Sequence, residues 1–203
     1  MKTDKGLLVV VSAPSGCGKD RVITELRKTD FVFDKTVSNT TRSQREGEVN
    51  GVDYTFIDKK TFEERIENGY FLEYTLFSDN YYGTPKEEVE KHLDKGGCIL
   101  LKIEVEGASN VRKSMPEAVT IFLVPPSMEE LERRLRERNS ETEESLKKRL
   151  ETARVELTRA PEYDYIVIND NLDDCVQQIR DIIECERARY PFMKSFVDNL
   201  LNN

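Results

Sequence analysis

A short apolar run followed by a glycine-rich turn constrains this chain of 203 residues more than any other feature. Residues 7–11 are all apolar, residues 13–20 read A-P-S-G-C-G-K-D, and a helix-like pattern follows. A buried strand, a glycine-rich turn ending in Gly-Lys and a helix together form a phosphate-binding P-loop. The backbone N–H groups of such a turn and the helix N-terminus point at one spot. The sequence therefore predicts a phosphate site, where Lys19 adds a full positive charge.

The turn departs from the GxxxxGK[ST] pattern at both ends. Ala13 stands in place of the first glycine, which is tolerable if its backbone φ angle is negative. Asp20 stands in place of the Ser or Thr whose hydroxyl normally binds Mg²⁺ beside the nucleotide phosphates. A carboxylate is also a hard oxygen ligand, yet it would repel phosphate if no metal lay between them. A glycine-rich turn that holds no ligand is the alternative interpretation of the motif alone.

Composition and charge exclude several classes of function. The chain carries a net charge of −8 with a pI near 5.0, which argues against a nucleic-acid partner. Its apolar runs are too short to span a bilayer and its first residues lack a signal-peptide pattern, so we expect a cytoplasmic protein without a membrane partner. The four cysteines lack CxxC spacing, which predicts neither a zinc site nor disulfides. The single histidine, His92, falls in a pattern typical of an exposed helix, which argues against histidine-dependent hydrolysis.

Alternating apolar and helical patterns predict an α/β fold. Strand-like runs occur at 7–12, 98–105, 119–125 and 165–169, separated by helical patterns at 18–28, 106–114, 127–138, 141–159 and 172–189. This alternation predicts a parallel sheet covered by helices on both faces, in a three-layer αβα core. Residues 35–97 predict a small mixed β insertion. Residues 187–203 predict a last amphipathic helix that either packs internally or makes a dimer, so we expect a monomer or a homodimer.

Several strings in the insertion and in the core resemble the guanylate kinase family. They include S-N-T-T-R-S-Q-R-E-G-E at 38–48, G-Y-F-L-E-Y at 69–74, N-Y-Y-G-T at 80–84, I-E-V-E-G at 103–107 and Y-D-Y-I-V-I-N-D at 163–170. The resemblance covers residues 5–187 in order, which is far more specific than one motif. It implies a P-loop core of residues 5–34, 98–126 and 160–203, a GMP-binding part at 35–97 and a lid at 127–159. It also implies transfer of the γ-phosphoryl group of ATP to GMP, and to dGMP, with Mg²⁺.

The insertion carries the residue types that hold a nucleoside monophosphate. Arg42 and Arg45 are three residues apart, which suits two guanidinium groups that grip one phosphate, and Tyr54 and Tyr82 add hydroxyl donors. Guanine presents two adjacent N–H donors, for which carboxylates are natural partners. The resemblance implies that Glu73 and Glu104 take this role. The GMP site implied in this way consists of Ser38, Arg42, Arg45, Tyr54, Glu73, Tyr82, Gly83, Thr84 and Glu104.

The resemblance also implies an ATP site and a set of catalytic cations. Phosphoryl transfer depends on positioning and on charge neutralisation, so it needs no histidine. Arginines of the lid would close over the transferring group and exclude water. The implied catalytic residues are Lys19, Arg42, Arg134, Arg138 and Arg149. The implied ATP-binding residues are Ala13, Pro14, Ser15, Gly16, Cys17, Gly18, Lys19, Asp20, Arg21 and Asn169.

Lys102 departs from the family pattern, which has an acidic residue at this position. An acidic group has appeared on the P-loop and a basic one on the facing strand, so we hypothesise that Asp20 binds the metal or pairs with Lys102. An active ATP:GMP phosphotransferase is favoured because the GMP clamp, Lys19 and the lid arginines occur together. The alternative is a catalytically impaired nucleotide- or protein-binding module, for which Ala13, Asp20 and Lys102 are the arguments. A regulatory GTPase would need an Asn-Lys-x-Asp motif, which the chain lacks.

Overall fold

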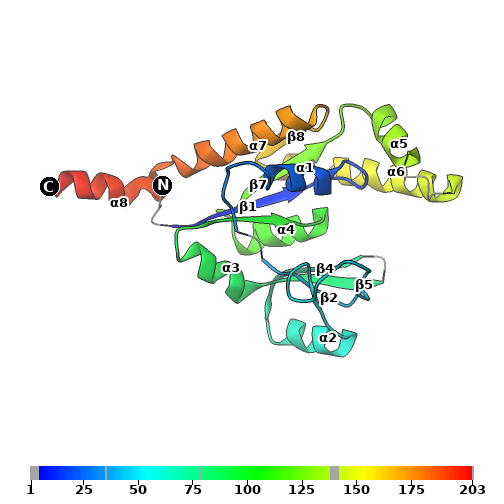
Figure 1. Cartoon of the computed structure of the whole chain (residues 1–203), viewed down its shortest axis with the longest axis horizontal. Helices are drawn as coiled ribbons and strands as arrows, with labels where there is room; N and C mark the ends of the chain where they lie inside the picture. The colour runs from blue at the N-terminus through cyan, green and yellow to red at the C-terminus, as the bar shows by residue number, and fades with distance from the viewer. Residues whose placement is uncertain (1–4, 35, 78, 138–141, 203) are drawn as a thin grey trace.

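A parallel four-stranded sheet forms the centre of the computed structural model, which describes residues 5–34, 36–77, 79–137 and 142–202 (Figure 1). The strand order is β6-β1-β7-β8 and every pairing is parallel. The strands are β1 (Leu7–Ser12), β6 (Cys98–Lys102), β7 (Val119–Val124) and β8 (Tyr165–Ile168). The run expected to be a strand to residue 105 leaves the sheet after Lys102, because the next helix already begins at Val105.

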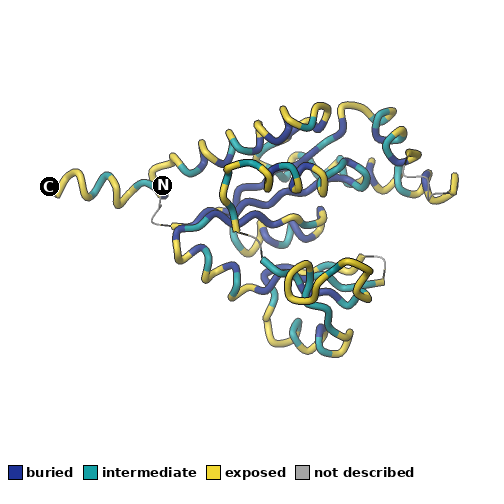
Figure 2. Tube along the Cα trace, in the orientation of Figure 1, coloured by how far each residue is buried: buried dark blue, intermediate teal, exposed yellow. Residues whose placement is uncertain are grey.

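Helices cover both faces of this sheet, as the alternation predicted. Alternate residues of β1 point to opposite faces, and all six are buried (Figure 2). Val9 belongs to a core cluster with residues of several helices, and Val10 to a second cluster on the other face. The first cluster includes residues of α1 (Lys19–Leu26), α5 (Met128–Arg136) and α7 (Leu172–Arg187), and the second includes residues of α3 (Lys86–Leu93) and α4 (Val105–Ser114).

A second, mixed sheet lies beside the first and fulfils the expectation of a β insertion (Figure 1). Its strand order is β3-β2-β5-β4, with one parallel and two antiparallel pairings. Helix α2 packs on it through Phe62, whose ring stacks on Phe71 at 4.4 Å and on Tyr81 at 5.0 Å. The elements are β2 (Asn39–Thr40), β3 (Thr55–Phe56), α2 (Lys59–Glu67), β4 (Phe71–Phe77) and β5 (Asn80–Pro85).

The remaining helices begin at well-formed caps or extend from the body. Ser127 caps α5, and Thr142 caps α6 (Glu143–Leu157), each by accepting a backbone N–H three residues further on. A 3₁₀ turn, η1 (Ala160–Glu162), leads into β8. Helix α8 (Tyr190–Leu201) projects away from the sheet, with Phe192 buried at its base and Leu200 and Leu201 exposed (Figure 1). None of the helices among the described residues is long and apolar enough to cross a membrane.

Candidate functional site

The P-loop connects β1 to α1, as the sequence predicted. Gly16 and Gly18 have φ angles of 92° and 82°, in a region that residues other than glycine rarely adopt. A Cβ atom on Gly16 would lie 2.6 Å from Leu135 Cδ2, so α5 also requires glycine there. Among the described residues, Asp79 is the only non-glycine residue with a positive φ. Ala13 is therefore accommodated without backbone strain, which removes one objection to the motif.

Pro14 and Cys17 of the P-loop are buried in the fold. Pro14 is buried, and Cys17 is 1% exposed. Burial raises the pKa of the Cys17 thiol to about 12, so this thiol stays protonated and unreactive. The Cys17 carbonyl accepts a hydrogen bond of 2.6 Å from Asn169 Nδ2. Asn169, expected near adenine, therefore braces the P-loop from the end of β8.

Lys19 lies between the P-loop and the carboxyl end of β6. Its Nζ donates to the Ile103 carbonyl at 2.7 Å and pairs with Glu104 Oε1 at 3.0 Å. Glu104 is a residue expected to bind guanine, so this ion pair joins the two expected nucleotide sites. The ammonium is held in place by neutral and acidic oxygens that a phosphate can replace.

Side chains from α6 reach the P-loop at Ser15. Arg149 donates to Ser15 Oγ from Nη2 at 3.0 Å and from Nε at 3.2 Å. Glu156 Oε2 accepts a 3.0 Å hydrogen bond from the Ser15 backbone N–H. Burial raises the pKa of Glu156, and the hydrogen bond from Ser15 offsets only part of this increase. The helix that the sequence placed in a lid thus contacts the phosphate-binding turn directly.

An open cavity of about 610 Å³ lies on the other side of the P-loop. Arg134 from α5 lines it, and its Nη1 donates to the Asn169 carbonyl at 2.8 Å. Its Nε pairs with Glu130 Oε1 at 2.7 Å. Arg21, which is exposed, lines the same cavity with Gly16 and Gly18. Arg138, the remaining expected lid arginine, lies outside the described residues.

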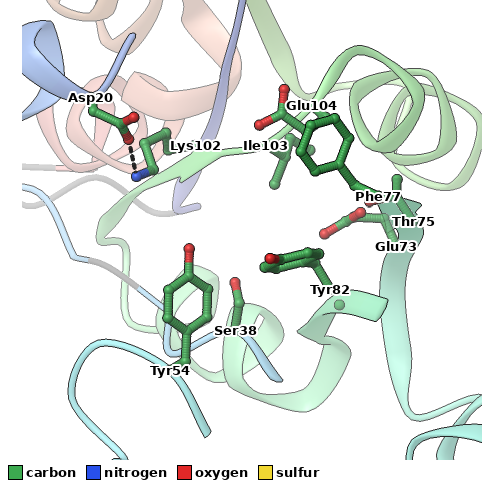
Figure 3. A pocket seen from close by; sticks show the side chains of 11 residues that line it. Asp20, Ser38, Tyr54, Glu73, Thr75, Phe77, Tyr82, Lys102, Ile103 and Glu104 are labelled. Carbon is green, nitrogen blue, oxygen red and sulfur yellow. Dashed lines mark hydrogen bonds and ion pairs between the residues drawn. The ribbon is translucent and has the colours of Figure 1, made fainter. Parts of the chain in front are cut away.

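A second cavity of about 190 Å³ lies where the two sheets face each other (Figure 3). Five of its residues come from β4 and β5, and the others lie just before β2 and β3 or just after β6, while Asp20 and Lys102 close the cavity on the P-loop side. Glu73 is its most buried charged residue, with 5% exposure, and it accepts a 2.6 Å hydrogen bond from Thr84 Oγ1. The lining residues are Asp20, Ser38, Tyr54, Glu73, Thr75, Phe77, Tyr82, Gly83, Lys102, Ile103 and Glu104.

Burial raises the pKa of Glu73 to about 7, while the hydrogen bond from Thr84 acts in the opposite direction. The nearby Glu104 carboxylate raises this pKa further. A Cβ atom on Gly107 would lie 2.6 Å from Glu73 Oε2, so glycine in α4 leaves room for this carboxylate. Two carboxylates held on one wall of a cavity are suited to accept two adjacent N–H donors of a ligand.

Arg42 contacts Tyr54, a lining residue of this cavity, and is held by an acidic neighbour. Its guanidinium forms two hydrogen bonds to Glu48, of 2.7 Å and 3.1 Å, and lies 5.5 Å from the centre of the Tyr54 ring. The Arg42 guanidinium lowers the pKa of Glu48, so the carboxylate stays ionised. Arg45, which is exposed, donates its backbone N–H to the same carboxylate at 2.8 Å. Tyr54 and Tyr82 lie with ring centres 6.0 Å apart, so three of the four residues expected in the phosphate clamp, Arg42, Tyr54 and Tyr82, lie together.

Asp20 and Lys102 form an ion pair and a hydrogen bond (Figure 3). This is one of the two outcomes that the exchanged charges predicted. The pair is exposed at Asp20, whose side chain is 79% accessible, and half-buried at Lys102. Among the residues described, no cluster of three or more His, Cys, Asp or Glu side chains has the geometry of a metal site. Asp20 is a carboxylate at the P-loop that could hold Mg²⁺ if the ion arrives on nucleotide phosphates and keeps several waters.

Two functional carboxylates were not expected from the sequence. Glu48 forms an ion pair with Arg42, and Glu156 accepts a hydrogen bond from a backbone N–H of the P-loop. Glu48 follows Arg45 by three residues, which was a signal for a local pair, because a turn brings such residues together. Glu156 is 141 residues from Ser15 in the chain, so no local pattern reveals the contact.

Comparisons with known proteins agree on one family. The guanylate kinase family model matches residues 5–186. A guanylate kinase from Clostridium tetani is 45% identical over 195 residues, covering 96% of this chain and 93% of that protein. One from Listeria monocytogenes is 46% identical over 188 residues, covering 92% of each. The crystal structure of guanylate kinase from Anaplasma phagocytophilum superposes with a TM-score of 0.77 at 33% identity, covering 95% of this chain and 92% of that one.

Proposed function

The chain belongs to the guanylate kinase family and is an ATP:GMP phosphotransferase, and we propose that its two cavities divide the substrates between them. GMP would occupy the cavity between the sheets, and ATP would lie along the P-loop. The observation that supports this division most is the Lys19–Glu104 ion pair, because it joins a phosphate-binding lysine to a carboxylate of the guanine pocket. The alternative of a module without catalysis has less support, since near-full-length relatives are named guanylate kinases.

In the proposed GMP complex, Glu73 and Glu104 accept hydrogen bonds from the guanine N–H groups. Ser38 and Thr84 lie near the guanine O6 edge, where the Ser38 hydroxyl donates to O6 and the Thr84 hydroxyl keeps its hydrogen bond to Glu73. Arg42, with Arg45 and Tyr82, holds the GMP phosphate, and Arg42 exchanges Glu48 for that phosphate. Adenine does not present the same pair of donors, so two carboxylates favour guanine over adenine.

In the proposed transfer, a GMP phosphate oxygen forms a bond to the γ-phosphorus of ATP. The bond from that phosphorus to the β,γ-bridging oxygen breaks, and its electron pair leaves with ADP. Lys19, Arg134 and Arg149 neutralise the negative charge that spreads over the phosphoryl oxygens. Mg²⁺, when bound with ATP, supplies further charge neutralisation at the phosphates, and Asp20 is the residue that would contact it. Arg138 is proposed for the same role on sequence grounds alone.

We propose the division of the chain that the resemblance implied. Residues 5–34, 98–126 and 160–203 form the nucleotide-binding core, residues 35–97 bind GMP, and residues 127–159 close over ATP. We further propose that the protein works in the cytoplasm, where its substrates occur, and binds neither nucleic acid nor membrane. Whether it acts as a monomer or a homodimer would be decided by light scattering, since the exposed end of α8 is the apolar surface in question.

The test is ADP formation from ATP with GMP, AMP, CMP or UMP as acceptor, at a series of Mg²⁺ concentrations. We expect turnover only when GMP is the acceptor, and we expect Lys19→Ala to abolish it. Lys60→Met is the matched control, because Lys60 is an exposed residue of α2 away from both cavities. Absence of turnover in the presence of normal GMP binding would support the module without catalysis. Equal turnover with AMP would contradict the proposed guanine pocket.

A further inference from the structure

Lys102 lies where the two proposed nucleotide sites meet. It is the last residue of β6, in parallel register with Val11, the second-last residue of the strand that leads into the P-loop. Its side chain lines the cavity between the sheets together with Tyr54 and Glu104 (Figure 3). It is thus a cation that faces the proposed GMP site while its partner, Asp20, belongs to the first turn of α1.

We propose that Lys102 is a further phosphate-binding residue for the transferred and accepting phosphates, and that it remains paired with Asp20 until substrate binds. This inference rests on the proposed function of the cavity. Asp20 keeps the ammonium beside the P-loop while no phosphate is present. When GMP enters, Lys102 exchanges the Asp20 carboxylate for the GMP phosphate, and Asp20 is left to face the metal that accompanies ATP.

The exposure of the pair argues that it exchanges readily. The Asp20 side chain is 79% accessible and that of Lys102 is 36% accessible, so water screens their attraction. Exposed ion pairs contribute little to stability, so breaking this one has little effect on the fold. A phosphate dianion in a partly enclosed cavity attracts the same ammonium more strongly than a single carboxylate does.

The environment of Tyr54 places Lys102 beside the phosphate clamp. In Figure 3 the Tyr54 hydroxyl points toward the end of β6 that carries Lys102. Burial is the main cause of the raised pKa of Tyr54, and the charge of Lys102 acts in the opposite direction. Arg42 lies over the face of the same ring. Lys102 and Arg42 therefore flank one tyrosine, and a phosphate bound at its hydroxyl would lie between two cations.

The test compares the binding of GMP with that of guanosine by calorimetry, without ATP and without Mg²⁺. Guanosine has the base but not the phosphate, so it reports on the guanine pocket alone. For Lys102→Met we expect about a tenfold weaker affinity for GMP, as for loss of one charge-assisted contact, with guanosine affinity unchanged within about twofold. Lys60→Met is the control, and Lys102→Arg should retain GMP affinity within about threefold because it keeps the charge.

Asp20→Asn gives a change of opposite sign. Without its carboxylate partner Lys102 is available at once, so we expect GMP affinity to rise about threefold. The gain should disappear when Asp20→Asn is combined with Lys102→Met, because the lysine transmits it. A gain in GMP affinity of equal size in the double variant would mean that Asp20 repels the phosphate directly. It would overturn the proposal that Lys102 exchanges Asp20 for the GMP phosphate.

The two proposals fail in different ways. If wild-type protein binds GMP and Lys102→Met binds it equally well, Lys102 is a surface partner of Asp20 and this inference is wrong, while the function stands. If wild-type protein binds neither GMP nor guanosine, the proposed function of the cavity is wrong and this inference falls with it. Circular dichroism of each variant verifies the fold. If Lys102→Met does not fold, Lys102→Gln takes its place in the same comparison.

Discussion

Three of the cations at the proposed phosphate sites are each paired with a carboxylate. Lys19 pairs with Glu104, Arg42 with Glu48, and Lys102 with Asp20. Lys19 and Arg42 could be predicted from the sequence, because P-loops and phosphate clamps require cations at set spacings, whereas Lys102 stood out only as a departure from the family pattern. Glu104 was assigned to guanine, because its pairing with Lys19 joins residues 85 apart in the chain, and Glu48, only 6 residues from Arg42, was assigned no role.

Replacing Arg42 with alanine should weaken GMP binding selectively. The guanidinium is the best placed donor for the GMP phosphate, so we expect the KM for GMP to rise on the order of 10- to 100-fold, as when a bidentate charged contact is lost. The KM for ATP should change by less than about threefold, because Arg42 lies away from the P-loop. Steady-state kinetics with each substrate varied in turn measures both values.

Glu48→Gln is the companion variant, since it removes the internal competitor of the GMP phosphate. We expect a lower KM for GMP, by about threefold, since the neutral amide competes less well for Arg42. An unchanged or raised KM would show that Glu48 orients Arg42 more than it competes with phosphate.

The buried carboxyl of Glu73 should make stability depend on pH. Burial raises its pKa from 4.5 to about 7. Between these two values the folded protein holds a proton that the unfolded chain releases, so the free energy of unfolding falls as pH rises through this window. Glu73→Gln removes the titration. Relative to this variant, wild type should lose roughly 2 kcal/mol of stability between pH 5 and pH 8, as the size of the pKa shift implies.

Urea denaturation of both proteins at pH 5 and pH 8 measures this difference. Parallel changes in the two proteins would show that Glu73 keeps an ordinary pKa in the folded state. Because the group must be ionised to accept two guanine N–H groups well, GMP affinity of wild type should also increase as pH rises toward 8.

Among the elements, the strands of the first sheet were predicted best. A strand buried on both faces is a continuous apolar run, and residues 7–12 could be located to the residue. Strands β2 and β3 have two residues each, which is too short for any period, so only the presence of a mixed sheet could be predicted. The end of β6 was placed three residues late, because Ile103 and Val105 continue the apolar alternation outside the strand.

Helix α7 should depend on its cap. Asn171 accepts the backbone N–H groups of Asp173 and Asp174, at 2.9 Å and 3.2 Å. Asn171→Ala leaves these donors without a side-chain acceptor and should lower the free energy of unfolding by about 1 kcal/mol. Asn171→Asp keeps an acceptor at a helix N-terminus and should stay close to wild type. Thermal unfolding of the three proteins makes the comparison, and equal losses for both variants would exclude the cap as the cause.

For the whole molecule, the fold class followed from the sequence, but the contact between its parts did not. Residues of the two sheets meet around one cavity, and Glu156 reaches across to the P-loop from α6. These contacts join segments that are distant in the chain. Residue chemistry together with the family resemblance gave the candidate site residues, whereas the pairing of Glu104 with Lys19 required the folded chain.

The two substrates should protect different parts of the molecule from hydrogen exchange. GMP alone should slow exchange in residues 38–48, which hold the Arg42–Glu48 pair, and in residues 71–84, which include lining residues of the cavity between the sheets. ATP with Mg²⁺ should slow exchange in residues 13–20 and 149–156, where α6 meets the P-loop. Mass spectrometry of peptides after exchange measures both patterns. Protection of the same peptides by either nucleotide alone would contradict two separate sites.

The acidic partners of the phosphate-binding cations also affect which phosphates the protein takes up. A substrate has to replace a carboxylate that is already bound, so it gains most when it carries more than one negative charge. The terminal phosphate of a mononucleotide is a dianion above its second pKa of about 6, whereas each phosphate within a nucleic-acid chain carries a single charge. The abundant RNA of a cell would therefore gain little by entering the cavity, which stays available for free nucleotides.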